Sequence, residues 1–274
     1  MISKKWGLLK MHSNFKIQLD KNTSFSLKGS GGLLIVGRSG SGKTNTTTYI
    51  MLKAVSQCDC GLYIVDAKRA DMYGLHSFLI DGKKVVVSTT NQIARLLRVL
   101  NENMSARYEH FKNGKWGQDF SEYGYRPYLL VIDEVSAMLA EAGKNKKEIM
   151  GELRQIILRG RQAGIFTLIS GQRIDATILD RDITLQLGTR IVMGQADSET
   201  YRMAFPMVND IKALPLVPNK PGYGLIYSDG QKISNPTPFV SPDMSNIDVP
   251  KVITRLENNY DSSKYNDESD YWQL

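Results

Sequence analysis

The sequence of 274 residues predicts an α/β protein whose mostly parallel sheet is covered by helices on both faces. Two observations predict this class. Short apolar runs, which suit buried strands, alternate along the chain with segments whose apolar residues recur at helical spacing. A glycine-rich turn also lies between an early apolar run and a helical segment, an arrangement typical of nucleotide-binding α/β proteins.

The first elements are indicated by patterning around two short strands. Residues 14–28 partly alternate polar and apolar types about an Asp-Lys-Asn-Thr turn, which predicts a β-hairpin leading into the core. The apolar run 33–36 then predicts a buried strand. The remaining elements of this half are a helix over 43–57, strands over 62–66 and 84–88, and a long helix over about 91–111.

The second half repeats the alternation of strands and helices. Residues 128–133 predict another buried strand, and 147–162 a helix that buries one apolar stripe. Strands over 165–170 and 189–193 follow. A Pro- and Gly-rich stretch from 215 to 242 is expected to end the core, and the acidic terminus to be disordered. We therefore divide the chain into a hairpin lead-in (1–30), a main α/β domain (31–242) and a C-terminal extension (243–274).

Composition excludes several classes of protein. The hydrophobic fraction of 42% and the charged fraction of 23% are ordinary for a globular protein. No apolar run approaches the roughly 18 residues that span a bilayer, and the N-terminus lacks the pattern of a signal peptide. The two cysteines, Cys58 and Cys60, have no second pair at metal-site spacing. We expect a cytoplasmic protein without a membrane segment.

The charge of +7 is unevenly distributed. From residue 257 onward five acidic residues oppose one lysine, so a charge of −4 falls there and +11 remains on residues 1–256. Such a balance favours a polyanionic partner.

A phosphate-binding loop follows the strand over 33–36. The segment matches G-x-x-x-x-G-K-[ST] without exception, and it lies between a buried strand and a helix as the mechanism requires. Backbone N–H groups freed by the glycines would converge on phosphate oxygens, together with the positive end of the helix dipole. The lysine would reach the β- and γ-phosphates, and the threonine hydroxyl would ligate Mg²⁺. The predicted nucleotide-binding residues are Gly37, Arg38, Ser39, Gly40, Ser41, Gly42, Lys43, Thr44 and Asn45.

An acidic pair ends the strand over 128–133. Asp133 would hold Mg²⁺ through water, and Glu134 would polarise the water that attacks the γ-phosphate. Gln172 follows the next strand, at the position where such ATPases keep a polar residue that senses the γ-phosphate. A loop amide bonded to backbone is the alternative interpretation of Gln172. Together these residues predict an ATPase that uses ATP and Mg²⁺.

Several further stretches resemble the FtsK/SpoIIIE branch of the FtsK–HerA motor ATPases. Val65-Asp-Ala-Lys68-Arg69 resembles that family's I-D-P-K-R, and Met104-x-x-Arg107-Tyr108 its M-x-x-R-Y. Ile132-Asp-Glu134 resembles the start of its I-D-E-F-A-D-L. Arg161-Gln-Ala-Gly164-Ile with Gly171-Gln-Arg173 resembles R-A-x-G-I-H-L-I-L-A-T-Q-R-P, and Thr189-Arg190-Ile resembles T-R-I. Order and spacing hold from about residue 15 to 228.

The resemblance implies a RecA-like P-loop core that assembles into a ring, usually hexameric, and pulls double-stranded DNA through a central channel. ATP would be bound between subunits, where an arginine of the neighbour reaches the γ-phosphate. Arg161 and Arg190 are the candidates by motif position, and Arg159 is the next candidate after them. An ordinary surface arginine or a local salt bridge is the alternative for each.

Basic side chains outside these motifs are candidates for non-specific contact with DNA phosphates. A solvated basic face explains them equally well. They are Lys144, Lys146, Lys147, Arg181 and Lys212.

Two other functions remain open alongside the DNA translocase. One is an assembly or switch ATPase that moves no DNA, and the other is a helicase-like ATPase directed to single strands. The acidic C-terminal tail, which carries Tyr271, Trp272 and Leu274, is a candidate for docking a recruiting protein.

Overall fold

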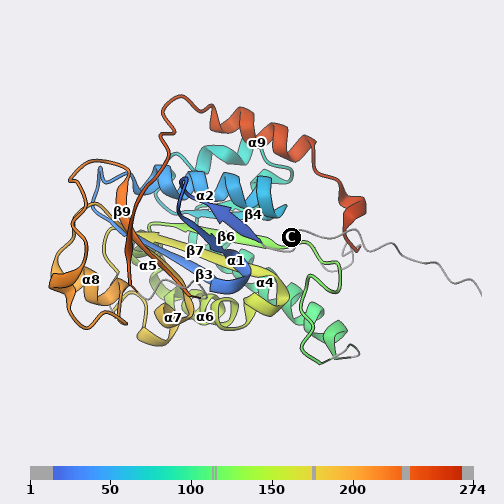
Figure 1. Ribbon diagram of the computed structural model, residues 1–274. Coiled ribbons are helices and arrows are strands. Elements are labelled where there is room, and N and C mark those ends of the chain that lie inside the picture. The colour runs from blue at the N-terminus through green and yellow to red at the C-terminus, as the bar shows by residue number, and fades with distance from the viewer. Residues whose placement is uncertain (1–14, 113, 115, 175–176, 230–234, 267–274) are drawn as a thin grey trace, which may run out of the picture.

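The computed structural model describes residues 15–112, 114, 116–174, 177–229 and 235–266. Its centre is one eight-stranded sheet (Figure 1), ordered β10-β9-β8-β3-β7-β6-β4-β5. The strands from β8 to β5 are parallel, whereas β9 is antiparallel to both β8 and β10. The predicted α/β class is therefore confirmed. The strands are β3 (Gly32–Gly37), β4 (Gly61–Asp66), β5 (Val86–Val87), β6 (Tyr128–Asp133), β7 (Ile165–Gly171), β8 (Thr189–Met193), β9 (Tyr223–Ser228) and β10 (Thr237–Val240).

The apolar runs form the central strands because both faces of the sheet are covered. Every residue of β3, β4, β7 and β8 is buried, and β6 is buried from its second residue onward. Continuous apolar runs are what a parallel sheet with two covered faces requires. Strand β7 lies between β3 and β6, so the phosphate loop and the acidic pair follow strands that are separated by a single strand.

Helices cover the two faces in separate layers (Figure 1). One layer contains α4 (Thr90–Phe111), α5 (Val135–Glu141) and α6 (Lys146–Ala163), and its core includes Leu97, Leu100, Ile149, Leu153 and Ile156. The opposite layer contains α2 (Lys43–Cys58) and α9 (Val249–Asn258), whose Ile253 is buried against the same cluster as Ile50 and Met51. Shorter elements complete the fold: α3 (Gly82–Val85), α7 (Arg181–Gln186), α8 (Ser198–Ala204) and the 3₁₀ turns η1 (Tyr73–Ser77), η2 (Gly143–Asn145), η3 (Ile211–Ala213) and η4 (Ser262–Lys264).

The predicted N-terminal hairpin is present and joins the main core. Strands β1 (Lys16–Gln18) and β2 (Ser24–Ser26) pair antiparallel and lead into α1 (Leu27–Ser30). Ile17, Leu19 and Phe25 are fully buried in the cluster that also contains α2. The hairpin is thus part of the layer above the sheet. Residues 1–14 of the predicted lead-in lie outside the described residues.

Three expectations differ from the structure. The strand over 84–88 is reduced to the two residues of β5, because Gly82–Val85 form α3. The stretch 215–242 does not end the core, since β9 and β10 extend the sheet and contribute Leu225, Ile226 and Phe239 to it.

Disorder from residue 257 is the third expectation, and it is wrong for residues up to 266. Helix α9 runs through Asn258, Tyr265 Oη donates to Asp59 Oδ2 at 2.9 Å, and Asn266 N donates to Gly124 O at 2.9 Å. Residues 267–274, to which the docking prediction refers, lie outside those described. None of the helices in the described ranges has the length and apolarity that a membrane crossing needs.

Candidate active site at the carboxyl ends of the parallel strands

The predicted phosphate loop joins the end of β3 to the start of α2. Gly40 and Gly42 have φ of +77° and +92°, a region that side chains disfavour, so glycine is required for the tight turn. Helix α2 begins at Lys43 directly after Gly42. Its unpaired N–H groups and positive dipole end therefore face the loop, which makes this helix end suited to an anion.

A turn before β9 holds the phosphate loop from behind. Gly222 N donates to Ser41 O at 2.9 Å, and a Cβ added to Gly42 would lie only 2.6 Å from Gly222 N. The two backbones thus approach so closely that a side chain at position 42 would collide with the turn at Gly222. The sequence did not indicate this support, because no strand or turn was predicted within the stretch 215–242.

The loop encloses a cavity of about 400 Å³ that fits a triphosphate. Gly40 lines this cavity, and a Cβ on Gly40 would meet no atom within 4 Å. The cavity is also lined by Lys43, Thr44 and Asp133, a cation, a hydroxyl and a carboxylate. These donors match phosphate and Mg²⁺, which usually takes one or two protein oxygens and completes its shell with phosphate and water.

Asp133 is positioned by its neighbours at the ends of β7 and β4. Ser170 Oγ donates to Asp133 Oδ1 at 2.7 Å, which fixes the carboxylate orientation. Asp66 is the register partner of Asp133 on β4 and is fully buried. Burial raises the pKa of Asp66, and the charge of Asp133 adds to this, while the N–H of Tyr73 opposes it. Asp66 accepts that N–H at 3.0 Å and so anchors the segment after β4.

Glu134 is buried beside two lysines. Its Oε2 lies 3.6 Å from Lys43 Nζ and 3.5 Å from Lys68 Nζ. Its Oε1 accepts hydrogen bonds from Ser136 Oγ at 2.6 Å and from the backbone N–H of Gln172 at 3.1 Å. Glu134 also has φ of +56°, a left-handed conformation that costs a non-glycine residue free energy and is found at functional sites.

These contacts keep the Glu134 carboxyl ionised. Burial alone would raise its pKa, because it removes water from the charged form. The hydrogen bonds from Ser136 and Gln172 and the charges of Lys43 and Lys68 outweigh burial, so the pKa of Glu134 lies below its ordinary value. A carboxylate that is ionised at neutral pH can accept a proton from water, as a general base must.

The structure brings the predicted central residues together and adds others. Lys43, Thr44, Asp133, Glu134 and Gln172 line one cavity. Gln172 contacts Glu134 through its backbone, and its side chain is exposed. The site residues that sequence reasoning missed are Lys68, Ser136 and Ser170, although Lys68 belongs to the D-A-K-R stretch that carries the family resemblance.

The two arginine candidates differ in their surroundings. Arg190 is 2% exposed, and its guanidinium donates to the carbonyls of Leu187, Thr184 and Ala204 at 2.9, 2.9 and 3.3 Å. Burial lowers its pKa. This guanidinium therefore holds α7 and α8 against β8 in the interior of the fold.

Arg161 is exposed at the end of α6 and passes beside Gly31, just before β3. The phosphate loop follows the other end of β3, and six strand residues span about 20 Å. Arg161 is therefore remote from the phosphate loop of its own chain. The guanidinium of Arg159, the next candidate, lies 5.0 Å from the centroid of the Tyr108 ring.

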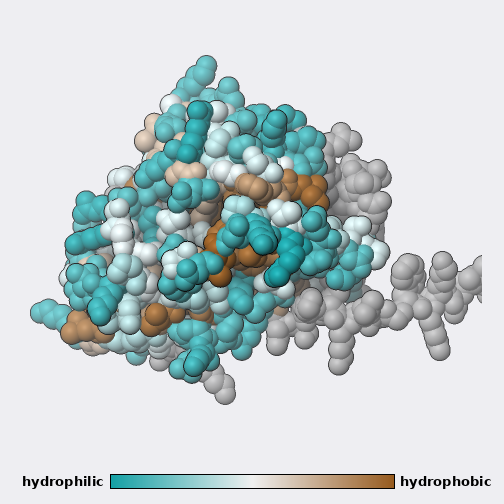
Figure 2. Space-filling view, turned by 90° about the horizontal axis from the view of Figure 1, so that it is seen from above, coloured by the Kyte–Doolittle hydropathy of each residue, from teal (hydrophilic) through white to brown (hydrophobic). Residues whose placement is uncertain are grey.

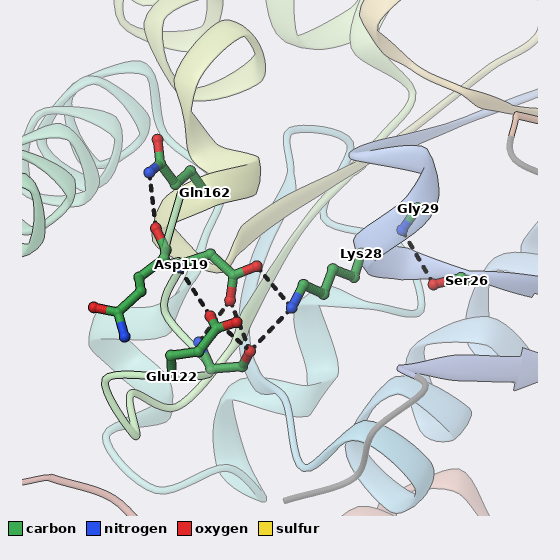
Figure 3. Close-up of polar contacts among 8 residues, drawn as sticks. Ser26, Lys28, Gly29, Asp119, Glu122 and Gln162 are labelled. Carbon is green, nitrogen blue, oxygen red and sulfur yellow. Dashed lines mark hydrogen bonds and ion pairs between the residues drawn. The ribbon is translucent and has the colours of Figure 1, made fainter. Parts of the chain in front are cut away.

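The end of α6 is fixed by a polar network with the loop before β6 (Figure 3). Gln162 Nε2 donates to Gln118 O at 2.9 Å, while Lys28 Nζ lies 2.7 Å from Asp119 Oδ2. The network joins α1, this loop and α6, so the backbone that carries Arg161 is held in place.

The candidate DNA contacts are exposed side chains on several elements. Lys144, Lys146 and Lys147 lie on η2 and the start of α6, whereas Arg181 begins α7 and Lys212 lies on η3. Helix α6 ends just before β7 begins, so the last residues of α6 lie near the amino ends of the parallel strands. The first residues of α6 therefore lie toward the carboxyl ends of these strands, where the phosphate cavity also lies.

Comparison with known proteins identifies relatives. Residues 2–118 match the family described as FtsK/SpoIIIE. Over 199 residues the chain is 31% identical to the FtsK domain-containing protein YdcQ of Bacillus subtilis (strain 168), and the match covers 70% of this chain and 40% of that protein. The chain thus spans less than half of this relative.

Solved structures share the fold at lower identity. The conjugation coupling protein TcpA of pCW3 matches with a TM-score of 0.72 and 20% identity over 89% of this chain and 70% of that one. The cytoplasmic domain of the type VII secretion ATPase EccC of Thermomonospora curvata matches with a TM-score of 0.66 and 18% identity, over 93% and 32% of the two chains. At such identities these matches show the fold alone.

Proposed function

Because this chain belongs to the FtsK/SpoIIIE family of ATPases, we propose that it hydrolyses ATP and uses the free energy to move double-stranded DNA. The observation that carries the hydrolytic part is the ionised Glu134 between Lys43 and Lys68 at the mouth of a phosphate loop. A phosphotransferase, whose substrate supplies the nucleophile, would not need a base for water at this place.

The residues of the cavity have distinct roles in this proposal. Lys43 and the N–H groups of the phosphate loop bind the β- and γ-phosphates, and Thr44 with Asp133 would hold Mg²⁺, which supplies charge neutralisation on the phosphates when bound. Glu134 accepts the proton of the attacking water. Gln172 links the γ-phosphate region to Glu134 through its backbone N–H.

We propose that the active form is a ring, with six subunits as the family resemblance implies, and that Arg161 completes the site of the neighbouring subunit. The geometry supports this assignment over Arg190, because Arg161 is exposed and lies about 20 Å from its own phosphate loop. A cation supplied across the interface would stabilise the charge that develops on the transferred phosphoryl group.

The proposal of duplex DNA as the partner rests on charge. The net charge of +11 on residues 1–256 and the exposed lysines at the start of α6 suit a phosphate backbone. TcpA, which shares the fold, is a conjugation coupling protein, and this agrees with a motor that serves DNA transfer by a mobile element. We accordingly place the motor in the cytoplasm, where its nucleotide and DNA are found.

A second function is suggested by the fold shared with a secretion ATPase, EccC. An ATPase of this architecture that acts on protein would hydrolyse ATP without regard to DNA. An assembly or switch ATPase, the alternative left open by the sequence, would likewise hydrolyse ATP at a rate that does not depend on DNA.

ATP turnover with and without DNA separates these functions. We expect marked stimulation by duplex DNA of unrelated sequences, with binding that weakens steeply as salt rises. Translocation should displace a third strand or a bound protein from the duplex, which binding alone does not achieve. Stimulation by single strands only would favour the helicase-like function. An active oligomer that ignores both forms of DNA would contradict the proposal.

A further inference from the structure

A groove lies between α7 and α8, outside the phosphate cavity. Its volume is about 450 Å³. Four apolar side chains line it, namely Leu185 of α7, Met203 of α8, and Pro206 and Val208 from the segment after α8. Leu185 is 43% exposed, so this apolar lining is open to solvent. Exposed apolar surface of this kind marks sites where another protein segment binds.

Basic side chains frame this α7–α8 groove. Arg181, at the start of α7, and Arg202 of α8 both line the groove and are exposed. Asp180 and Asp182, the neighbours of Arg181 in the sequence, pair with Arg154 instead. Within the ranges that the structure describes, neither Arg181 nor Arg202 forms an ion pair. Both guanidinium groups can therefore receive the carboxylates of a partner.

Two other cavities carry acidic side chains. Figure 2 shows the face that carries α9, where apolar surface gathers near the middle, framed by hydrophilic side chains. On this side, beside α2, lies an apolar cavity whose one charged lining residue among those described is Asp71. The cavity beside α3 carries Asp81 and Glu257 as well as Lys84 and Arg126. The charged groups that line the α7–α8 groove are both basic, so this groove suits an acidic ligand.

The chain itself contains a segment of matching chemistry. Residues 267–274 carry three acidic residues and no basic one, together with two aromatic residues and a leucine: Asp267, Glu268, Asp270, Tyr271, Trp272 and Leu274. We infer that the α7–α8 groove binds residues 267–274 of a second copy of this chain. The acidic side chains pair with Arg181 and Arg202. Trp272 fills the apolar centre, because tryptophan is among the commonest anchors of protein interfaces.

The position of the chain end favours a second copy over the chain's own segment. In Figure 1, α8 lies at the left, whereas the last described residues, drawn in red, lie at the right. Asn266 N donates to Gly124 O in the loop before β6, and two strands separate β6 from β8, which α8 contacts. A contact between unlike surfaces of successive copies can close into a ring. The inference needs no nucleotide and goes beyond the proposed function.

Binding of a peptide tests the groove directly. The probe is a fluorescent peptide of residues 264–274, amidated at its end so that side chains alone supply its negative charge. The host is the full chain with Trp272→Ala, which reduces competition from the host's own segment. Fluorescence anisotropy measures the affinity, and the unfolding midpoint shows whether each host variant is folded.

We expect Leu185→Asp and Arg202→Glu in the host to weaken peptide binding by at least about tenfold, because each places a carboxylate in the groove. Ile247→Asp and Arg255→Glu are the matched controls and should not change binding, since both residues are exposed on the side of α9. A peptide with lysine at its three acidic positions should prefer a host with both Arg181→Glu and Arg202→Glu. Misfolding cannot produce such a reversal of preference.

Mixing two full-chain variants tests which copy supplies the segment. Trp272→Ala keeps the groove but lacks the anchor, whereas Leu185→Asp keeps the segment but has an altered groove. In sedimentation velocity we expect each variant alone to associate at least about tenfold more weakly than the wild type. An equimolar mixture should recover part of the association. Because the contact lies between copies, the stability of a single folded subunit should not change.

Any of three results would overturn the inference. The peptide could fail to bind the Trp272→Ala host, or it could bind the groove variants as tightly as the controls. The mixture could also associate no better than its components. If duplex DNA, and not the peptide, loses affinity with Leu185→Asp, the groove belongs to nucleic acid instead. A wild type that binds the peptide but hydrolyses no ATP would contradict the proposed function and leave this inference standing.

Discussion

Lys68 Nζ lies 3.5 Å from Glu134 Oε2, at nearly the same distance from that oxygen as Lys43 Nζ. The carboxylate predicted to activate water is therefore paired with two cations, one from the phosphate loop and one from the segment after β4. Because Lys68 is the more exposed of the two, with 44% of its side chain accessible, it can be removed with less disturbance of the phosphate loop.

Loss of Lys68 should raise the pKa of Glu134. Its positive charge favours the ionised carboxyl, so Lys68→Met moves the pKa upward and the base is protonated at a higher pH. We expect the acidic limb of the pH profile of kcat to shift to higher pH. Lys83→Met, an exposed lysine outside the cavity, is the control. Superimposable profiles for Lys68→Met and the wild type would contradict the role of Lys68.

Arg190→Ala should destabilise the fold. The substitution leaves up to three buried carbonyls without their donor, and each unpaired group costs about 1–3 kcal/mol. We expect the free energy of unfolding to fall by about 3 kcal/mol in a denaturant titration. An unchanged unfolding midpoint together with lost turnover would show instead that Arg190 acts on the nucleotide.

Arg161→Ala should abolish most turnover while leaving stability unchanged. The side chain is exposed, and an arginine that stabilises phosphoryl transfer across an interface contributes about 10³-fold or more to kcat. Mixing Lys43→Ala subunits with Arg161→Ala subunits should restore part of the turnover, because some interfaces regain both groups. A fully active monomer would contradict the composite site. Arg159→Ala provides the neighbouring control.

Removal of residues 259–274 should lower stability without changing the turnover of the folded protein. It deletes the contact of Tyr260 with the Arg126 guanidinium, 3.6 Å from the ring centroid, and the Tyr265 hydrogen bond to Asp59. We expect a loss of about 1–3 kcal/mol. Removal of residues 267–274 alone is the matched control and should change neither quantity. Loss of turnover after the longer deletion, under conditions where the protein is folded, would contradict this account.

The central fold was predictable because local patterns and global structure agree there. Apolar runs became buried parallel strands, and Gly37–Thr44 with Asp133 and Glu134 met at one edge of the sheet because parallel strands all point that way. The sequence could not place Gly222 beside Gly42, or Tyr265 beside Asp59, since such contacts depend on how distant segments pack. It also could not distinguish a buried Arg190 from an exposed Arg161, because motif position carries no information on burial.

The most direct test of the central claim compares ATP binding and single-turnover hydrolysis in Glu134→Gln and the wild type. The glutamine keeps the size of the side chain but cannot accept a proton from water. We expect ATP affinity within a small factor of the wild type and a hydrolysis rate lower by about 10²–10⁴-fold. Hydrolysis by Glu134→Gln at the wild-type rate would contradict the assignment of Glu134 as the base.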